Sequence, residues 1–332
     1  MAHLFCWVAM NKCRVFSLYF MILLASFFPG CSHPEEVKKI DLSKREAVKE
    51  STGGEERIKI GLVPEQDIRK MASRFEPLAE YLNKKLGAKV TLIYLDSYAE
   101  VCDKFIYKQL DAAFFGSFSY ALTHAKAGVE PLARPDYSGT STYRGLIIVR
   151  QEGKINSTAD MQGRRLALVH RATYAGYLFP LYYFNKQGIK DLNEYFSEIT
   201  FAGGHDKSIF MLLRGEADIA APKDLVYQRV IKENPNLEKQ LVILAVSGPV
   251  PSNALCVSKD FKPALKEKLK AILLNLDKYP DSAPVLAALG ASRFIETKDE
   301  DYQYLYETIK ALGIDLNTYP YYERPDIGFK KE

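Results

Sequence analysis

The sequence has little of the residues that define several specialised classes of protein. Its 332 residues include 5 cysteines and 1 tryptophan, and its formal net charge is only +4. Five cysteines are too few for a disulfide scaffold. The basic residues do not cluster, so no stripe of charge is available to follow a nucleic-acid backbone, and we expect no nucleic-acid partner. An apolar fraction of 47% and a charged fraction of 26% exclude a disordered, collagen-like or polytopic membrane protein.

The motifs of several common enzyme classes are also missing. The sequence contains no G-x-S-x-G, H-E-x-x-H, G-x-x-x-x-G-K-[ST] or C-x-x-C, and its histidines do not pair at metal-ligand spacing. We therefore expect no metal, no cofactor and no catalysis. A hydrolase built around His205 is a minor alternative that lacks a recognisable nucleophile. Cys102 and Cys256 could form a bridge in an oxidising compartment, but two buried free thiols are the favoured interpretation.

The N-terminus has the features of an export signal. Lys12 and Arg14 precede an apolar run of 14 residues, 15–28, which is shorter than the roughly 20 residues needed to cross a bilayer. The following Gly30-Cys31 resembles the end of a bacterial lipoprotein signal. We predict that residues 1–30 are a signal peptide of the lipoprotein type and that Cys31 becomes the lipidated N-terminus of an exported protein. This protein would be anchored to the membrane and face the periplasm, or lie on the outer face of the cell membrane. An ordinary signal peptide with a chance cysteine is the alternative.

Residues 31–57 are charged and have no sustained apolar period, which indicates a flexible tether. From Ile58 onward, strand-like and helix-like segments alternate, and this predicts mainly parallel sheets flanked by helices. The alternation runs through 58–142 and starts again at 143, so we predict two α/β lobes. Lobe 1 comprises 58–142 plus 251–332, lobe 2 comprises 143–250, and the two chain crossings between them act as hinges.

Several segments, in this order, resemble the periplasmic binding components of ABC importers for phosphate, phosphite and phosphonate. They are GLVPEQ (61–66), SYAEV (97–101), DAAFFGSFSYALTHA (111–125), STYRGLIIV (141–149), MQGRRLALVHRATYAGYLFP (161–180), FAGGHDKSIFMLLRGEADIAAPKDLVYQRV (201–230) and SGPVPSNAL (247–255). The resemblance implies the two-lobed type II periplasmic binding fold, in which two hinge crossings let a cleft close on its ligand. It also implies ABC permease transmembrane subunits as partners, and we expect a monomer.

Three strand-to-helix junctions can present unpaired N–H groups to an oxyanion. They lie at Ser117, at Thr173-Tyr174 and at His205. In the family that the chain resembles, the second junction is a run of Ser and Thr whose hydroxyls hold the phosphoryl oxygens. Here only Thr173 keeps a small hydroxyl, and Tyr174 would either donate at longer range or narrow the pocket. His205 is at the position of the family's ligand-contacting histidine, where a bound anion would raise its pKa.

The resemblance suggests further ligand contacts. Tyr98 is at the position of an aromatic contact in the first lobe, and Ser141, Thr142 and Tyr143 are at the first hinge crossing. Asp224 lies near a position where some family members use a carboxylate to recognise a ligand ammonium, although helix capping is an alternative role for it. The sequence thus predicts a lipid-anchored component of an ABC importer that binds a small phosphorus oxyanion. A sensory module that reports its ligand to a membrane histidine kinase, or a binder of a different small anion, remains an alternative.

Overall fold

A computed structural model describes residues 56–322 of the chain. By its internal contacts the chain divides into residues 1–53 and residues 54–332, and the described residues belong to the second unit. The predicted signal peptide, Cys31 and nearly all of the predicted tether therefore lie outside the described residues. None of the helices between residues 56 and 322 combines the length and apolar character that a bilayer-spanning segment needs.

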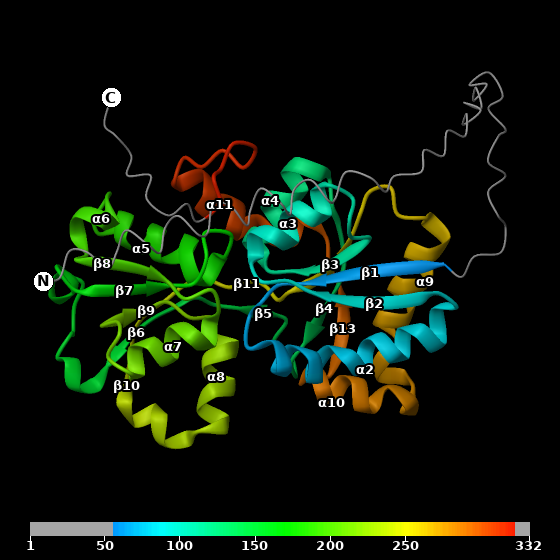
Figure 1. Cartoon of the computed structure of the whole chain (residues 1–332), viewed down its shortest axis with the longest axis horizontal. Helices are drawn as coiled ribbons and strands as arrows, with labels where there is room; N and C mark the ends of the chain where they lie inside the picture. The colour runs from blue at the N-terminus through cyan, green and yellow to red at the C-terminus, as the bar shows by residue number, and fades with distance from the viewer. Residues whose placement is uncertain (1–55, 323–332) are drawn as a thin grey trace, which may run out of the picture. The chain divides into compact units, whose positions relative to one another are not determined.

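The first sheet has six strands in the order β13-β4-β12-β3-β1-β2 (Figure 1). Three of its strands are parallel to one another: β1 (Arg57–Leu62), β2 (Lys89–Tyr94) and β3 (Ala112–Phe115). The others are β4 (Glu130–Asp136), β12 (Ala254–Val257) and β13 (Arg293–Glu296), and each pairs antiparallel to its neighbours. Helices α2 (Ile68–Leu86), α9 (Pro263–Leu274) and α10 (Ala283–Leu289) cover one face, and α3 (Tyr98–Ile106) and α4 (Ser117–Ala127) cover the other.

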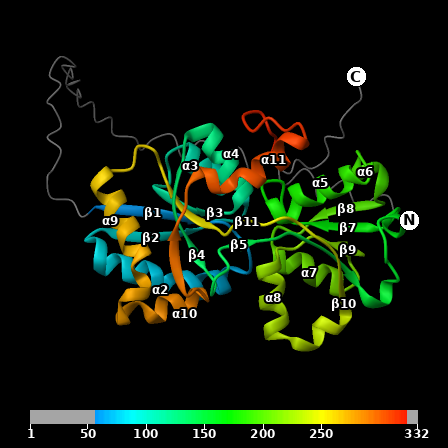
Figure 2. The ribbon, with the colours of Figure 1, turned by 180° about the vertical axis from the view of Figure 1, so that it is seen from behind.

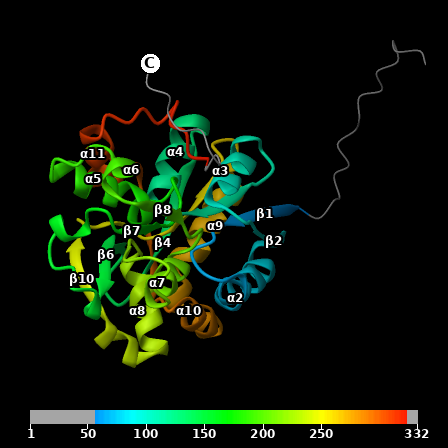
Figure 3. The same cartoon turned by 60° about the vertical axis from the view of Figure 1, so that its left-hand side comes forward.

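The second sheet has five strands in the order β10-β6-β9-β7-β8. Figure 2 shows β7, β8, β9 and β10 from behind. They are β6 (Leu146–Arg150), β7 (Arg165–Leu168), β8 (Glu198–Phe201), β9 (Ile219–Ala220) and β10 (Leu241–Val246). Helices α7 (His205–Leu213) and α8 (Asp224–Glu233) pack on one face, and α5 (Phe179–Lys186) and α6 (Leu192–Tyr195) pack on the other. Figure 3 shows α7 and α8 on the opposite side of this sheet from α5.

A short antiparallel pair connects the two sheets. It is formed by β5 (Thr142–Tyr143) and β11 (Val250–Pro251), in which Val250 is opposite Tyr143. We propose to divide the folded part at this pair, so that lobe 1 carries the six-stranded sheet and lobe 2 the five-stranded one. Helix α11 (Gln303–Ala311) follows β13, and beyond it the Tyr319 hydroxyl donates to the backbone oxygen of Arg171 in lobe 2 at 3.1 Å. The C-terminal segment therefore contacts both lobes, since the Tyr319 ring also packs on Phe118 of α4.

The sheets are mixed rather than mainly parallel as expected. In lobe 1 the β1–β2 and β1–β3 pairs are parallel, but the β12 strand that returns from the hinge is antiparallel to β3. In lobe 2, β7 is parallel to β8 and β9, whereas β6 runs antiparallel to β9. The strand that enters a lobe from the hinge starts at the end where the neighbouring strands finish, so it must run in the opposite direction. The two cysteines of the described residues, Cys102 and Cys256, are buried and free, as favoured.

Individual N-cap residues determine where the helices that follow the central strands begin. Ser97 begins α3, and its side chain accepts a hydrogen bond from the Glu100 N–H, as the S-x-x-E pattern predicts. Gly116 and Gly204 are the N-cap residues of α4 and α7. The junction after β7 is different, because residues Tyr174–Leu178 form one π-helical turn before α5 begins. Such turns occur most often at functional sites.

Gly176 is required in this π-helical turn because its backbone crosses close to Val169. A Cβ atom at Gly176 would lie 2.3 Å from the Val169 Cβ and 2.8 Å from the Thr173 Oγ1. We expect Gly176→Ala to lower the free energy of unfolding by about 1–3 kcal/mol, the usual cost of overpacking. Urea denaturation followed by far-ultraviolet circular dichroism measures it.

Gly153→Ala is the matched control for this substitution. The nearest atom to a Cβ at Gly153 is the Arg150 Cβ, at the ordinary contact distance of 3.9 Å. Its free energy of unfolding should stay within about 0.5 kcal/mol of the wild-type value. Equal stabilities of the two variants would contradict the close crossing of the chain at Gly176.

Candidate functional site

A cavity of about 10 Å³ lies where the two lobes meet, with room for the centre of about one water molecule. Its walls come from chain segments that follow or precede the strands of both sheets. They are formed by Glu65, Tyr98, Gly116, Tyr143, Ala172, Thr173, Tyr174, His205, Lys223 and Asn253. Ligands of α/β proteins bind at the carboxyl ends of strands, and this cavity lies at that position in both lobes.

Lys223 places a buried ammonium group on the wall of the cavity, and sequence analysis did not identify it. Its side chain is 4% exposed, and its ammonium donates to the Glu65 carboxylate and to the Asn253 Oδ1, the latter at 3.0 Å. The ammonium also lies 4.2 Å from the centre of the Tyr143 ring, close enough for a cation–π interaction. Burial lowers the pKa of Lys223, whereas the nearby Glu65 carboxylate opposes that shift.

Glu65 holds together a cluster of charges contributed by both lobes. Besides Lys223, the guanidinium groups of Arg74 and Arg229 lie 3.7 and 3.6 Å from its Oε2 atom. Burial alone would raise the pKa of the Glu65 carboxyl, but these three cations outweigh burial and hold the pKa well below its usual range. One carboxylate therefore faces three basic side chains, which leaves the cluster with excess positive charge.

His205 is buried at the start of α7 and lines the cavity as predicted. Its Nδ1 atom accepts a hydrogen bond from the backbone N–H of Lys223 at 3.1 Å, so the neutral ring carries its proton on Nε2. Burial lowers the pKa of His205 to about 3, and the cations Lys223 and Arg229 act in the same direction while Glu65 opposes them. The ring is therefore a neutral donor in this arrangement. Its backbone N–H donates to the Glu65 carbonyl oxygen at 3.0 Å, across the two lobes.

Three tyrosines predicted from the sequence line the cavity. The Tyr98 hydroxyl is buried and has no hydrogen-bond partner among the described residues. Burial and the charge of Glu65 raise the pKa of Tyr98 well above its ordinary value, so this hydroxyl stays protonated and can donate. The Tyr143 hydroxyl accepts from the Ser117 N–H at 3.3 Å. Tyr174 donates to the Gly248 carbonyl oxygen at 3.4 Å, so it narrows the cavity rather than offering a long-range donor.

Thr173 lines the cavity but does not present the donor that we expected. Its hydroxyl donates to the His170 carbonyl oxygen at 2.6 Å, and its backbone N–H points to the same oxygen at 3.0 Å. Only the lone pairs of the Thr173 oxygen are left for a ligand. Ala172 and Tyr174 are its neighbours on this wall, so Thr173 supplies the one small hydroxyl of this junction.

Four predicted contacts do not line the cavity. The Ser117 hydroxyl donates to the Pro251 carbonyl at 2.8 Å, which turns it toward the hinge strand. Ser141 offers its carbonyl to Arg134 and Ser252, and Thr142 is paired with Pro251 in the hinge. The Asp224 carboxylate accepts a hydrogen bond from the neighbouring Leu225 N–H at 2.7 Å in the first turn of α8, whose N-cap residue is Lys223. The preceding residue, Lys223, takes the place in the cavity that we predicted for Asp224.

Glu65, Lys223 and Asn253 were missed, although all three lie inside segments that carry the family resemblance. Glu65 and Lys223 directly follow the proline that ends GLVP and ADIAAP, and Asn253 follows Pro251-Ser252 in SGPVPS. A charged or amide residue directly after a buried strand, at the edge where the lobes meet, is the feature that could have indicated them. The pairing of Glu65 with Lys223 joins residues 158 positions apart, which no local pattern reveals.

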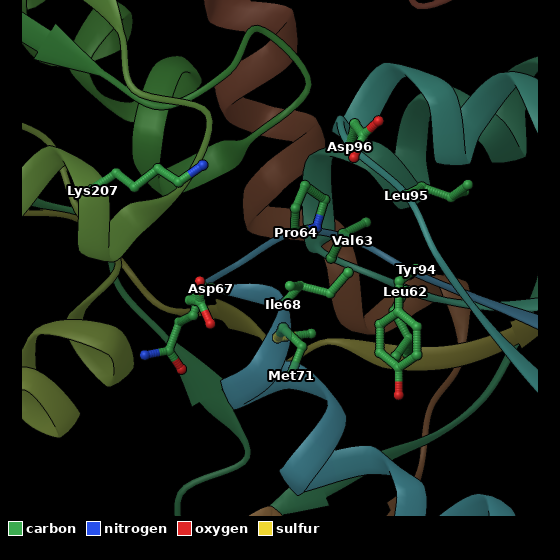
Figure 4. A pocket seen from close by; sticks show the side chains of 11 residues that line it. Leu62, Val63, Pro64, Asp67, Ile68, Met71, Tyr94, Leu95, Asp96 and Lys207 are labelled. Atoms are coloured by element: carbon green, nitrogen blue, oxygen red, sulfur yellow. The ribbon is translucent and has the colours of Figure 1, made fainter.

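A larger groove of about 210 Å³ lies beside the loop between β1 and α2 (Figure 4). Leu62, Ile68 and Met71 give it an apolar floor, and Lys207 approaches it from the α7 side. The Asp67 carboxylate on its wall already caps α2 by accepting from the Arg69 N–H. The groove has no set of convergent donors, so the smaller cavity is the better candidate for an anion.

Comparisons with known proteins bear on the family and fold of the chain. A family model described as the periplasmic substrate-binding protein of phosphonate ABC transporters matches residues 60–302. The phosphate-import protein PhnD of Mycolicibacterium smegmatis is 26% identical over 261 residues, which are 75% of this chain and 77% of that protein. A probable ABC transporter phosphite-binding protein of Prochlorococcus marinus, PhnD1, is 24% identical over 272 residues, 78% of this chain and 90% of that one.

Solved structures show the same fold. PhnD1 of Prochlorococcus marinus in complex with methylphosphonate superposes with a TM-score of 0.70 at 23% identity, covering 78% of this chain and 98% of that one. A binding component of an ABC phosphonate transporter from Pseudomonas aeruginosa gives a TM-score of 0.73 at 20% identity, covering 78% and 87%. The predicted two-lobed type II periplasmic binding fold is therefore confirmed.

The buried, neutral His205 should make stability depend on pH. Its pKa in the folded protein is about 3, compared with 6.5 for the unperturbed side chain. Between these values the unfolded chain binds more protons at this residue than the folded one, so the free energy of unfolding falls as the pH drops below about 6.5. His205→Asn, which keeps an acceptor for the Lys223 N–H, should flatten this dependence.

Urea midpoints at pH 7.5 and pH 5 measure the effect in the wild type and in His205→Asn. His170 also has its pKa lowered, to about 4, mainly by burial, so some dependence should remain in the variant. An identical loss of stability in the two proteins would show that His205 is not the residue whose protonation is coupled to unfolding.

Proposed function

Because the chain belongs to the family of exported periplasmic substrate-binding proteins of phosphonate and phosphite ABC transporters, we propose that it captures a small phosphorus oxyanion between its lobes and delivers it to an ABC permease. The mechanism is capture in the open cleft, closure about the paired strands β5 and β11, and docking of the closed form. Phosphite, phosphate and a phosphonate with a small substituent are the candidate ligands.

The observation that carries this proposal is the Tyr98 hydroxyl. It is a buried donor on the wall of the cavity, and no described residue accepts its hydrogen bond. A buried polar group without a partner costs roughly 1–3 kcal/mol, so native structures rarely keep one unless something binds there. The neutral His205 ring, with its proton on Nε2, adds a second donor on the opposite lobe. Donors from two lobes that converge on a cavity suit an oxyanion.

The size of the cavity supports a small ligand. In the closed arrangement its volume is about 10 Å³, and Tyr174 takes up space where the family's smaller side chains are usual. A bulky organic phosphonate would require the walls to move apart and would break the contacts between the lobes. Phosphite or methylphosphonate requires the smallest displacement.

Membrane attachment through Cys31 is part of the proposal. The basic residues before the apolar run and the Gly30-Cys31 pair support a lipoprotein signal. A lipid on Cys31 would leave the charged segment before Ile58 as a tether that keeps the folded part near its permease. A single acyl chain binds membranes only weakly, so stable attachment implies more than one chain on this residue.

Removing the Tyr98 hydroxyl should affect binding and stability in opposite directions. We expect Tyr98→Phe to weaken the binding of the preferred oxyanion by about 1–3 kcal/mol, because a buried donor to the ligand is lost. The ligand-free protein should be as stable as the wild type or more stable, because the unpaired polar group is gone. Isothermal titration with phosphite, phosphate, methylphosphonate and 2-aminoethylphosphonate measures binding, and thermal unfolding measures stability.

Tyr302→Phe is the matched control, because the Tyr302 hydroxyl is also buried, has no partner between residues 56 and 322, and does not line the cavity. It should leave every affinity within about twofold. If the folded wild type shows no heat with any of the four anions, the proposed function is wrong. If Tyr98→Phe binds like the wild type, the hydroxyl is not a ligand contact.

Lipid attachment can be tested directly in an exporting bacterial host. The wild-type protein should sediment with membranes and incorporate labelled palmitate. Cys31→Ala should do neither, because residue 31 then lacks the thiol to which the lipid is attached. Cys102→Ala is the control, since that thiol is buried in the folded part. Recovery of wild-type protein in the soluble periplasmic fraction without label would contradict the lipid anchor.

A further inference from the structure

We propose that Lys223 contacts the bound oxyanion directly and makes the site reject ligands that carry an ammonium group, while Glu65 positions it from the opposite lobe. This inference rests on the proposed function and names the selectivity of the same site. The proposal differs from the role that sequence analysis gave to this end of α8, where Asp224 was expected to accept a ligand ammonium.

The geometry leaves Lys223 one donor to spare. An ammonium has three N–H groups. Glu65 and Asn253 accept two of them, and the Tyr143 ring lies on a further side at 4.2 Å. The Lys223 side chain lines the cavity and is 4% exposed. An oxyanion in the cavity would therefore supply the acceptor that the third N–H group lacks.

The charges around the cavity also favour an anion. Lys223, Arg74 and Arg229 surround Glu65, which is the one carboxylate in this cluster. Buried nitrogen atoms of both arginines, Nη1 of Arg74 and Nε and Nη2 of Arg229, have no hydrogen-bond partner among the described residues. These guanidinium groups lie beside the Glu65 carboxylate and make the electrostatic potential at the cavity more positive. Charge interactions are stronger there than in water, because the dielectric constant of a buried site is low.

The same arrangement leaves no free carboxylate to accept a ligand ammonium, and Thr173 offers only a neutral hydroxyl oxygen. The Glu65 carboxylate is already shared among three cations, and it lines the cavity next to Lys223. The Asp224 carboxylate is outside the cavity and bonds to the Leu225 N–H. An aminophosphonate would bring its ammonium close to the Lys223 ammonium, and no carboxylate would be available to offset the repulsion.

Glu65 holds Lys223 in place only when the lobes are together. Glu65 follows β1 in lobe 1, whereas Lys223 precedes α8 in lobe 2. The same loop makes two more contacts across the lobes: the Glu65 carbonyl oxygen accepts from the His205 N–H, and the Asp67 N–H donates to the Asp206 carboxylate at 3.1 Å. Closure thus brings the ammonium to its position in the cavity together with the other donors.

The experiment compares two ligands in two proteins. Titration calorimetry gives the affinities of methylphosphonate and 2-aminoethylphosphonate for the wild type and for Lys223→Met. The wild type should prefer methylphosphonate by about thirtyfold or more. In Lys223→Met, methylphosphonate should bind about tenfold or more weakly, as expected for the loss of a charge-assisted hydrogen bond, and 2-aminoethylphosphonate should bind no worse. The ratio of affinities is the decisive readout, since a merely looser cleft would weaken both ligands alike.

The variant is designed to stay folded. When Lys223 is replaced by Met, the Glu65 carboxylate keeps the two guanidinium groups at 3.6 and 3.7 Å, so no isolated buried charge is created. If thermal unfolding shows that Lys223→Met is nevertheless disrupted, Lys223→Gln replaces it, because its amide can still donate to Glu65. Lys232→Met is the control on the same helix; Lys232 is exposed, and its loss should leave both affinities within about twofold.

Each outcome decides a different claim. A wild type that binds none of the phosphorus oxyanions overturns the proposed function. A wild type that binds methylphosphonate but binds 2-aminoethylphosphonate equally well overturns the selectivity. An unchanged affinity ratio in the folded Lys223 variants, with a functional wild type, overturns the role of Lys223 and leaves the proposed function standing.

Discussion

The buried carboxylate of Glu65 joins the two lobes, because the cations that neutralise it come from both of them. Arg74 belongs to lobe 1, and Lys223 and Arg229 belong to lobe 2. A carboxylate that is removed from water without partners is very costly, so the closed arrangement depends on bringing lobe 2 against the loop that carries Glu65. In the open form water can solvate the same groups, so the pair need not contribute much net free energy to closure. Its effect is to fix which groups face the cavity once the lobes close.

Much of the fold follows from local sequence patterns. Apolar residues recur at helical spacing from Ile68, and helix α2 begins there. Ser97 and Glu100 form the S-x-x-E pattern of a helix start, and α3 follows Ser97. Helix α7 begins at His205, one of the three junctions named from the sequence. Strand β4 (Glu130–Asp136) was not predicted, because Pro131 and Pro135 argue against an interior strand. In the structure β4 nevertheless pairs with β12 on one side and β13 on the other, and its register with β12 is irregular near Pro131. Tertiary pairing there overrides the local preference of proline against an interior strand.

The candidate site was predictable to a smaller extent. Residues at helix starts, such as His205 and Tyr98, were identified because such positions and the family resemblance point to them. The direction of each hydrogen bond was not predictable. The Thr173 hydroxyl donates to the His170 carbonyl oxygen, and the His205 ring accepts from the backbone N–H of Lys223. Whether a polar side chain presents a donor or an acceptor to the cavity depends on neighbours brought together by folding. A residue type alone does not specify it.

These hydrogen-bond directions give the cavity a definite preference. The Tyr98 hydroxyl and the third N–H group of Lys223 are donors, and His205 carries its proton on Nε2. Thr173, by contrast, has already used its proton and can only accept. A fully deprotonated oxyanion would find three donors from α3, α7 and the start of α8, but would meet the lone pairs of Thr173 unfavourably. An oxyanion that retains one P–OH group can donate that proton to Thr173 while its remaining oxygens accept. If the cavity holds the proposed oxyanion, the hydrogen bond from Thr173 to His170 therefore affects which protonation state of the ligand fits, and not only the number of contacts.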